Sequence, residues 1–339
     1  MPPVPLLRNI LIVRTDRIGD VVLTTPAIKA LRRRYPRARL SVLIAPSTVD
    51  LVNGNPYIDD ILIDERDGRH KGLFGFLRLV KEIRLKQFDA VIIFHTKRRY
   101  NLACCAAGIP YRLGYKNNKL GFLLTHPLKD QRFKGEKHEA QYCLDVLKAI
   151  DVVSTDLDMF VPVQKEAEAW AARWMEQEHL KANEFMVVHA GASDPAKCWM
   201  PANFATLMDR LVEHYGFKIV LMGASQTVAL SDEILRQTSK RSQFIDMTGQ
   251  TSLAQTASLL RRARLLISND SGPVHVGAGV GIPVVSLFLR DQPGINAERW
   301  KPLGPKGFFL KGKSGLIQVD EVMALIEQIL QKNNQYEIF

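Results

Sequence analysis

The sequence NILIVRTDRIGDVVLTTPA (residues 9–27) joins an apolar run to a helical pattern. The run at 9–13 predicts a buried strand because it is almost entirely apolar and is followed by charge, and a helix is expected from Asp20 onward. A carboxylate therefore stands where a strand passes into a helix. The residues alone leave two interpretations open. Asp20 caps the helix, or it is a base that Arg14 and Arg17 keep ionised and able to accept a proton.

The same alternation of apolar strands and amphipathic helices continues through both halves of the chain. Strands are expected at 9–14, 39–45, 60–64 and 88–95, and then at 185–190, 217–222, 264–268 and 283–288. Helices are expected at 20–35, 47–53 and 72–86, and then at 165–180, 201–215, 226–238, 251–262, 272–279 and 319–332. Apolar strands separated by helices predict an α/β fold with parallel sheets covered on both faces.

The length of 339 residues is too great for one hydrophobic core. We expect two doubly wound domains, 1–162 and 163–339, joined by a linker near residues 161–165. In such sheets, ligands bind beyond the carboxyl ends of the strands. Polar clusters that directly follow strands are therefore candidates for a site in a cleft between the two domains.

Charge is unevenly distributed along the chain. Residues 1–160 carry 27 basic and 17 acidic side chains, a net charge of +10, whereas the remainder carries only +1 of the total of +11. The first half should therefore face an acidic partner: nucleic acid, an anionic membrane or a phosphorylated substrate. No nucleic-acid-binding module is recognised in the sequence, so nucleic acid is not an expected partner.

Compartment and membrane topology are also indicated by the sequence. The four cysteines, Cys104, Cys105, Cys143 and Cys198, include no C-x-x-C pair and predict reduced thiols in a cytoplasmic protein. Apolar runs are interrupted well before the ~18 residues of a membrane-spanning helix. The first residues lack the pattern of a signal peptide.

The clearest polar cluster is ISNDSGPVHVG (267–277), which follows an expected strand. Ser271 can cap the next helix, whose N-terminal N–H groups form an anion site, and Gly272 lets a phosphate approach the backbone. His275 can donate to a phosphate oxygen, and Asp270 can accept from a sugar hydroxyl. The alternative is a capped helix with a buried histidine. We favour a site for a phosphate and a polyol.

Two further strand ends in the second half contribute candidates. The loop HAGASDPAKCW (189–199) carries Lys197, which can neutralise a leaving diphosphate, although the loop lacks the full P-loop pattern. Met222 and Gly223 follow another strand and form either the floor of a nucleotide pocket or a tight turn.

The first half offers His95, Lys97 and Arg98 after a strand. They form a basic segment that is expected to bind an acidic acceptor, with a simple charged loop as the alternative. Asp156 and Asp158 have the D-x-D spacing of metal-dependent sugar transfer, but they precede the linker rather than follow a buried strand. We interpret them as a solvated turn and expect no metal site.

The helix expected at 72–86 has more apolar residues than one core face needs. The predicted core face consists of Leu73, Phe76, Leu77, Val80 and Ile83. Outside it lie Phe74, Leu79 and Leu85 among the basic residues Lys71, Arg78, Lys81, Arg84 and Lys86. Core packing is the favoured account of this segment, and contact with a membrane surface is the alternative.

Three motifs together resemble the lipopolysaccharide heptosyltransferases of glycosyltransferase family 9. They are RTDRIGDVVLTTPAIKALRRRYP (14–36), HAGASDPAKCW (189–199) and SNDSGPVHVGAGVGIPVVSLF (268–288). The resemblance covers nearly the whole chain. It implies a GT-B fold, in which two Rossmann-like domains face a central cleft. It also implies inverting, metal-independent transfer of L-glycero-D-manno-heptose from ADP-heptose to the anionic inner core on lipid A, at the cytoplasmic face of the inner membrane.

The resemblance assigns roles to the candidate residues. Asp20 matches the family's catalytic base, and the donor is expected to contact Lys197, Met222, Gly223, Asp270, Ser271, Gly272 and His275. The acceptor is expected to contact Arg14, Arg17, His95, Lys97 and Arg98. No cofactor is implied, and a monomer is expected.

One segment departs from the family pattern, and other functions stay open. Residues 289–293 read LRDQP where the family often has a Gly-Pro-Thr-like turn, which leaves the donor sugar open. The alternatives are transfer from another nucleotide sugar, a sugar-nucleotide epimerase of the same fold, or a binding protein without activity.

Overall fold

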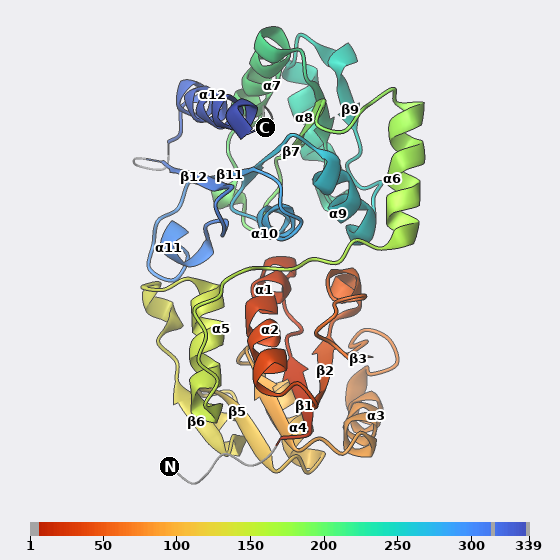
Figure 1. Ribbon diagram of the computed structural model, residues 1–339, viewed down its shortest axis with the longest axis vertical. Helices are drawn as coiled ribbons and strands as arrows, with labels where there is room; N and C mark the ends of the chain where they lie inside the picture. Colours follow the sequence, from red (N-terminus) through yellow and green to blue (C-terminus); the bar gives the residue numbers. More distant parts are fainter. Residues whose placement is uncertain (1–6, 313–315, 337–339) are drawn as a thin grey trace. The chain divides into compact units, whose positions relative to one another are not determined.

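The computed structural model describes residues 7–312 and 316–336 (Figure 1). The chain divides into two compact units, residues 1–162 and 163–339. Each unit is built around its own six-stranded sheet, in which all neighbouring strands are parallel. The α/β class expected from the alternating pattern is therefore confirmed.

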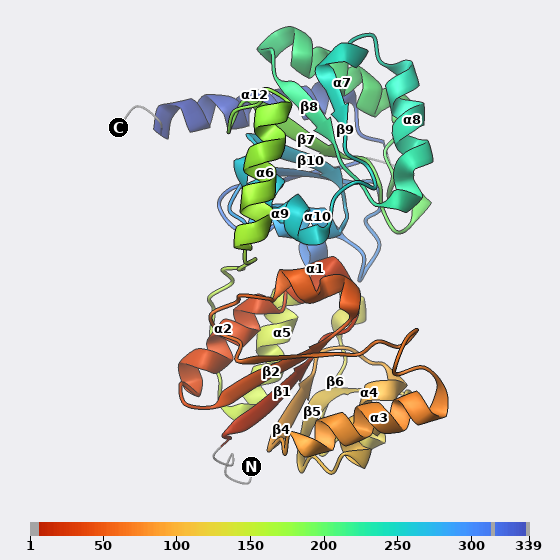
Figure 2. The ribbon, with the colours of Figure 1, turned by 90° about the vertical axis from the view of Figure 1, so that its right-hand side faces the viewer.

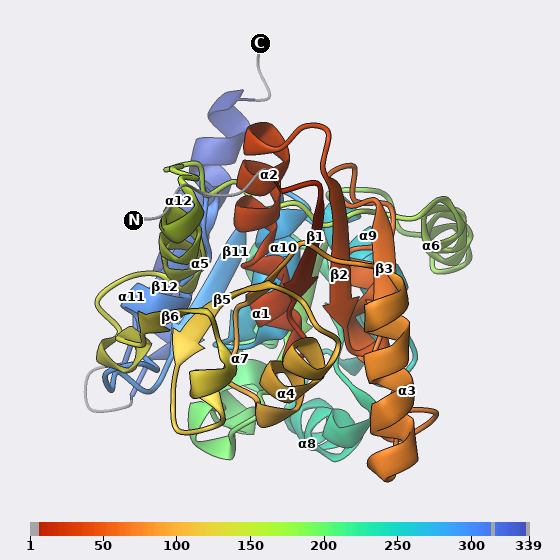
Figure 3. The same ribbon diagram turned by 90° about the horizontal axis from the view of Figure 1, so that it is seen from below.

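The first unit contains a sheet in the order β3-β2-β1-β4-β5-β6. Its strands are β1 (Asn9–Val13), β2 (Arg39–Ile44), β3 (Asp60–Ile63), β4 (Ala90–Ile93), β5 (Tyr111–Lys116) and β6 (His126–Lys129). Its helices are α1 (Ile18–Val22), α2 (Thr25–Arg34), α3 (Gly72–Leu85), α4 (Arg98–Ala106) and α5 (Glu139–Leu147), with short 3₁₀ turns at Pro46–Leu51, Gly121–Leu123, Arg132–Lys134 and Lys148–Ile150. Helices α3 and α4 cover one face of the sheet, and α2 and α5 cover the other (Figures 2 and 3).

The second unit repeats this plan with the order β9-β8-β7-β10-β11-β12. Its strands are β7 (Phe185–His189), β8 (Lys218–Leu221), β9 (Phe244–Asp246), β10 (Leu265–Asn269), β11 (Val284–Phe288) and β12 (Gly307–Lys311). Its helices are α6 (Lys165–Gln177), α7 (Pro201–Tyr215), α8 (Val228–Gln237), α9 (Leu253–Arg262), α10 (Gly272–Gly279), α11 (Ala297–Trp300) and α12 (Val319–Tyr336), with 3₁₀ turns at Pro195–Lys197, Ser225–Thr227 and Arg241–Gln243. Helix α12 packs against α7 and contributes Val322 and Ile326 to the core of this unit.

Both sheets have the same topology when each is counted from its own first strand: 3-2-1-4-5-6. The order reverses between β1 and β4 in the first unit and between β7 and β10 in the second. Connections leave these paired strands toward opposite faces, so a crevice forms beyond their carboxyl ends. The topology therefore marks the segments after β1, β4, β7 and β10 as the positions for ligand binding.

The helix expected at 20–35 is in fact two helices, because Pro26 interrupts it. Proline has no N–H to donate to the preceding turn and its ring crowds the carbonyl there, so Pro26 lies in the first turn of the new helix α2. The hydroxyl of Thr24 donates to the carbonyl of Asp20 (2.8 Å) and that of Thr25 donates to the carbonyl of Val22 (2.7 Å). These bonds satisfy the last carbonyls of the short helix α1.

Four strands were not predicted: β5, β6, β9 and β12. Three of them, β6, β9 and β12, lie at the edges of their sheets and are partly exposed. They therefore lack the continuous apolar run that marks a buried strand. Strand β6 also contains Pro127, which is tolerated at a sheet edge. The segment expected as a helix at 47–53 is a 3₁₀ turn at Pro46–Leu51.

The predicted core face of α3 is wrong in part. Leu73 and Leu77 are exposed, whereas Leu79 is buried together with Val80 and Ile83. Gly75 has no side chain, so the first turn of α3 lies directly against the backbone of His70. This close packing accompanies a rotation of the helix that leaves Leu73 and Leu77 on its exposed side. Within the described part of the chain, no helix is both long and apolar enough to cross a membrane.

The contact at Gly75 predicts a large stability effect. A Cβ atom at this position would lie far inside the van der Waals distance of the His70 backbone. Gly75→Ala should therefore lower the free energy of unfolding by about 1–3 kcal/mol, although alanine is the better helix former. The measurement is the urea midpoint of the variant beside Arg78→Ala, an exposed position on the same helix. Equal midpoints for the two variants would show that Gly75 does not set the packing.

Candidate functional site

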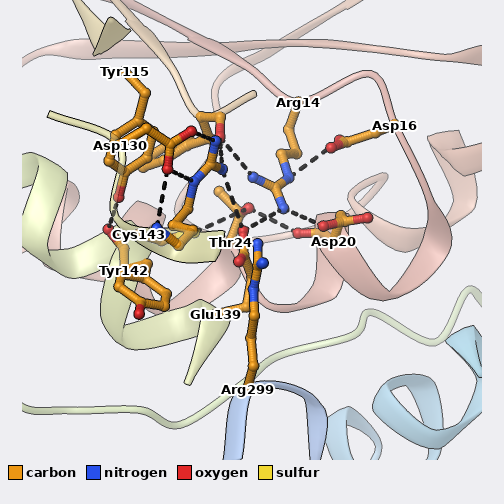
Figure 4. A network of polar contacts seen from close by, with 12 residues as sticks. Arg14, Asp16, Asp20, Thr24, Tyr115, Asp130, Glu139, Tyr142, Cys143 and Arg299 are labelled. Atoms are coloured by element: carbon orange, nitrogen blue, oxygen red, sulfur yellow. Dashed lines mark hydrogen bonds and ion pairs between the residues drawn. The ribbon is translucent and has the colours of Figure 1, made fainter. Parts of the chain in front are cut away.

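Asp20 lies inside α1, in its first turn, and does not cap it. The N-cap position belongs to Arg17, and no side chain makes a capping hydrogen bond there. The carboxylate of Asp20 is nearly buried and accepts a hydrogen bond from Nη2 of Arg14 instead (Figure 4). The capping interpretation is therefore wrong, and the position of Asp20 needs another explanation.

Arg14, the first residue after β1, is the centre of a buried polar network. Its Nη1 donates to the carbonyl of Phe94 after β4 (3.0 Å), and its Nη2 also donates to Oε1 of Glu139 (2.9 Å). Its Nε lies 3.1 Å from Oδ1 of Asp16. The guanidinium is thus surrounded by protein partners and is only 3% exposed. We reassign Arg14 from acceptor binding to the positioning of Asp20.

A second arginine supports this network from the other side. Arg132 also donates to the carbonyl of Phe94 (2.9 Å), and it makes two bonds to the carboxylate of Asp130 (2.9 and 2.8 Å). Its guanidinium lies 4.1 Å from the centre of the Tyr115 ring. Arg132 therefore ties the segment after β6 to the end of β4 and closes the network around Glu139, which it approaches to 3.8 Å.

Burial and neighbouring negative charge raise the pKa of Asp20 to about 6. Removal of the carboxylate from water is the largest cause, and Asp16 and Glu139 add to it, while Arg14 acts in the opposite direction. Arg14 therefore favours the ionised carboxylate, as expected, but burial outweighs it, which the sequence did not reveal. A carboxylate with such a pKa is still mostly ionised near neutral pH but is a stronger base than an exposed one, which suits proton transfer.

The basic segment after β4 is less basic than its sequence indicates. His95 is buried with Nε2 3.0 Å from Oγ1 of Thr15, and burial lowers its pKa to about 3. His95 therefore carries no positive charge, which corrects its predicted place in a basic cluster. Lys97 is half-buried and donates to the carbonyl of Thr15 (3.1 Å). Arg17 and Arg98 are exposed, so their charges are available to a ligand.

In the second unit, the ends of β7 and β10 are joined by Asn269. Its side-chain oxygen accepts from the backbone N–H of Trp199 (2.9 Å), and its amide nitrogen donates to the carbonyl of Ala190. The loop from Ala190 to Trp199 is thereby held beside β10. Within this loop, Lys197 forms an ion pair with Asp270, so two of the predicted donor-binding residues lie together.

The start of α10 differs from the expectation for Ser271. The residue occupies the N-cap position, but its hydroxyl makes no capping bond. It lies 2.9 Å from Oγ of Ser268 and 3.3 Å from Nδ1 of the half-buried His189. The Ser271 hydroxyl therefore does not cap α10, and the role of this helix start as an anion site stays a prediction. His275 is buried one turn further along.

The turn after β8 is tight at Gly223. A Cβ atom there would collide with the hydroxyl of Thr227 and lie 3.2 Å from the methyl group of Thr248. Met222 is buried beside it. These contacts account for the glycine by packing alone, so a role of Met222 and Gly223 in a nucleotide pocket stays a prediction.

Three partner residues of the site were missed in the sequence. Glu139 lies on α5, 125 positions from Arg14, and Asn269 lies within a quoted motif but has no distinct local signal. Arg290 forms an ion pair with Asp194 and so joins the loop after β11 to the loop of Lys197. The D-x-D residues are engaged elsewhere: Lys29 of α2 lies 2.8 Å from Asp156 and 3.4 Å from Asp158.

Comparisons with known proteins agree with this arrangement. The family model of glycosyltransferase family 9 (heptosyltransferase) matches residues 76–312. The lipopolysaccharide heptosyltransferase 3 of Escherichia coli K12 is 26% identical over 284 residues, with 80% of this chain and 79% of that protein covered.

Two solved structures of glycosyltransferases support the fold. A family 9 glycosyl transferase from Veillonella parvula superimposes with a TM-score of 0.87 at 24% identity, covering 96% of this chain and 98% of that one. The E. coli heptosyltransferase WaaC with ADP gives a TM-score of 0.75 at 15% identity, covering 95% and 99%. The predicted GT-B fold is therefore confirmed, and the chain belongs to glycosyltransferase family 9.

Proposed function

We propose that this chain transfers L-glycero-D-manno-heptose from ADP-heptose to a sugar of the lipopolysaccharide inner core, with inversion and without a metal ion. The observation that carries the proposal is Asp20, a buried carboxylate of raised pKa that Arg14 holds at the end of β1. Membership of family 9 supports the reaction type, and the lipopolysaccharide heptosyltransferases among its relatives support the substrate class.

In this proposal Asp20 removes the proton from an acceptor hydroxyl. The hydroxyl oxygen attacks the anomeric carbon of the donor as the bond to the diphosphate breaks, and ADP leaves with the bonding electrons. Attack from the opposite side inverts the anomeric configuration. Arg14 acts only through Asp20, whose carboxylate it orients.

The leaving diphosphate gains negative charge, and the second unit offers groups of the opposite polarity. Lys197, the N–H groups at Ser271 and Gly272, and His275 are proposed to bind it. Asp270, now paired with Lys197, is proposed to accept from a sugar hydroxyl. Lys197 would then lie between its carboxylate partner and the diphosphate.

The acceptor is proposed to be anionic and attached to lipid. The excess of positive charge in the first 160 residues supports this, with Arg17, Lys97 and Arg98 as contacts. The proposed place of action is the cytoplasmic face of the inner membrane, and the proposed state is a monomer. Residues 289–293 depart from the turn that the family often has, so a different nucleotide sugar is the second candidate donor.

The first test is acceptor-dependent release of ADP. Purified protein receives ADP-heptose with a panel of truncated inner-core acceptors, beside Asp20→Asn and the exposed control Asp158→Asn. We expect Asp20→Asn to lose about 10²–10⁴-fold in turnover, because one positioned base supplies that much, with unchanged affinity for ADP. Release with another nucleotide sugar only would favour the second candidate donor. No release despite ADP binding would contradict transfer.

The pH profile tests the network around Asp20. Activity of the wild type should fall as pH drops through about 6, where Asp20 becomes protonated. Glu139→Gln removes a negative charge that raises the pKa of Asp20, so the acidic limb of kcat/KM should move to lower pH. Glu136→Gln, on an exposed side chain three residues earlier, is the control and should leave the limb in place. A limb that stays or moves upward in Glu139→Gln would refute this account.

The donor site is tested by calorimetric titration with ADP. Lys197→Gln should weaken ADP binding by roughly tenfold to a hundredfold, as expected for loss of a charged hydrogen bond. The substitution also removes the cation paired with Asp270, whose negative charge would then oppose a bound diphosphate. Lys181→Gln removes an equal charge from an exposed position of the same unit and should bind ADP normally. Equal affinities of both variants would remove Lys197 from the donor site.

A further inference from the structure

Helix α3 exposes a row of large apolar side chains. Leu73 is 70% exposed, Phe74 86%, Leu77 52% and Leu85 70%. The helix packs on the sheet through its other side, where Gly75, Leu79, Val80 and Ile83 are buried. The exposed row therefore lies outside the face by which α3 packs on the core. Figure 2 shows α3 along the outside of its unit.

Exposed cations accompany this row. They are Lys71, Arg78, Lys81, Arg84 and Lys86, all of which are exposed. The single acidic residue of α3, Glu82, points to the other side, where its carboxylate lies 3.3 Å from Nε2 of the buried His70 and 3.7 Å from Arg69. The outer surface of α3 thus combines apolar and positive side chains, and α3 itself contributes no acid to it, whereas Lys86, just after the helix, is paired with Asp60 (2.7 Å).

The spacing places these groups on one side of the helix. Residues three or four apart in an α-helix share a face, and the series 73, 77, 81 and 85 and the series 74, 78, 81 and 84 follow that rule. Cationic and apolar side chains therefore lie together along one strip. Lys and Arg can extend their charged ends beyond the apolar groups around them.

The chemistry of the strip favours a membrane over a protein partner. Interfaces between proteins are depleted of lysine at their apolar centres, whereas here Lys81 lies in the middle of the strip. A helix that lies in a bilayer surface shows the opposite pattern, with apolar side chains at the acyl boundary and cations at lipid phosphates. The net charge of +10 over residues 1–160 adds long-range attraction to such a surface.

We propose that the outer strip of α3, defined by Leu73, Phe74, Leu77, Lys81 and Leu85, binds the surface of an anionic lipid bilayer. The proposal deepens the proposed function, because it names the surface that would bring the enzyme to a lipid-attached acceptor. Its test uses lipid alone and does not depend on the sugar chemistry.

The experiment is co-sedimentation of the full chain with vesicles. One set contains phosphatidylcholine only, and the other contains phosphatidylcholine with phosphatidylglycerol. Binding is expected to the anionic vesicles and to fall with salt. Phe74→Ser/Leu77→Ser should reduce binding by roughly tenfold or more, since two apolar side chains no longer insert. Arg78→Gln/Lys81→Gln should reduce it by about fivefold per charge.

Matched controls separate the strip from general charge and from misfolding. Val153→Ser alters another exposed apolar residue of the same unit, and Arg173→Gln/Lys181→Gln removes two charges from exposed positions of the other unit. These controls should bind like the wild type. Absence of binding to anionic vesicles, or equal losses in strip variants and controls, would overturn the proposal. ADP release with soluble truncated acceptors should be unchanged in the strip variants. The vesicle assay therefore tests membrane binding, and the ADP-release assay tests the proposed transfer reaction, independently of each other.

Discussion

The buried guanidinium of Arg14 is the interaction on which the first unit depends. It lies among the carboxylates of Asp16, Asp20 and Glu139 and bonds the carbonyl at the end of β4. Arg14 contacts three carboxylates, and the other arginine of the network, Arg132, is paired with Asp130, so negative charge is in excess in a medium of low polarity and one of the carboxylates must hold its proton more strongly. Although burial also opposes ionisation of Asp16, Arg14 and Lys97 lower the pKa of Asp16. The raised pKa falls on Asp20, the carboxylate that we propose as the base.

The position of this network follows from sheet topology rather than from any single motif. Arg14 leaves β1 and Phe94 leaves β4, the two strands between which the order of the first sheet reverses. Asn269 and Ala190 occupy the equivalent ends of β10 and β7 in the second sheet, where they also bond one another. In both units a polar side chain thus joins the two strand ends that border the crevice. These bonds hold the loops that carry the proposed ligand-binding residues.

The α/β fold and the position of Asp20 could be predicted from the sequence. Other features of the fold and of the candidate site could not, and the reasons are physical. The central strands are buried on both faces, so their apolar runs are unmistakable, whereas β6, β9 and β12 are partly exposed and lack such a run. The place of Asp20 was evident from the passage of strand into helix. Its pKa was not, because Glu139 lies 125 positions from Arg14 and only the fold brings them together. The neutral state of His95 likewise depends on burial, which a basic neighbourhood in sequence does not reveal.

In the first unit, most positive charges lie at the surface, and a group of carboxylates is buried beneath them. Its excess of positive charge lies largely on exposed side chains such as Arg17 and Arg98, where water and salt weaken their effect on any one buried group. Beneath them, the carboxylates around Arg14 outnumber the cation that they share. A surface that attracts an anionic acceptor would by itself stabilise the ionised form of a nearby carboxylate and make it a poorer base. Burial of Asp20, with Asp16 and Glu139 beside it, outweighs the effect of Arg14 and raises the pKa of Asp20, so that under the proposed function an anion-attracting surface and a proton acceptor would be compatible in one small unit.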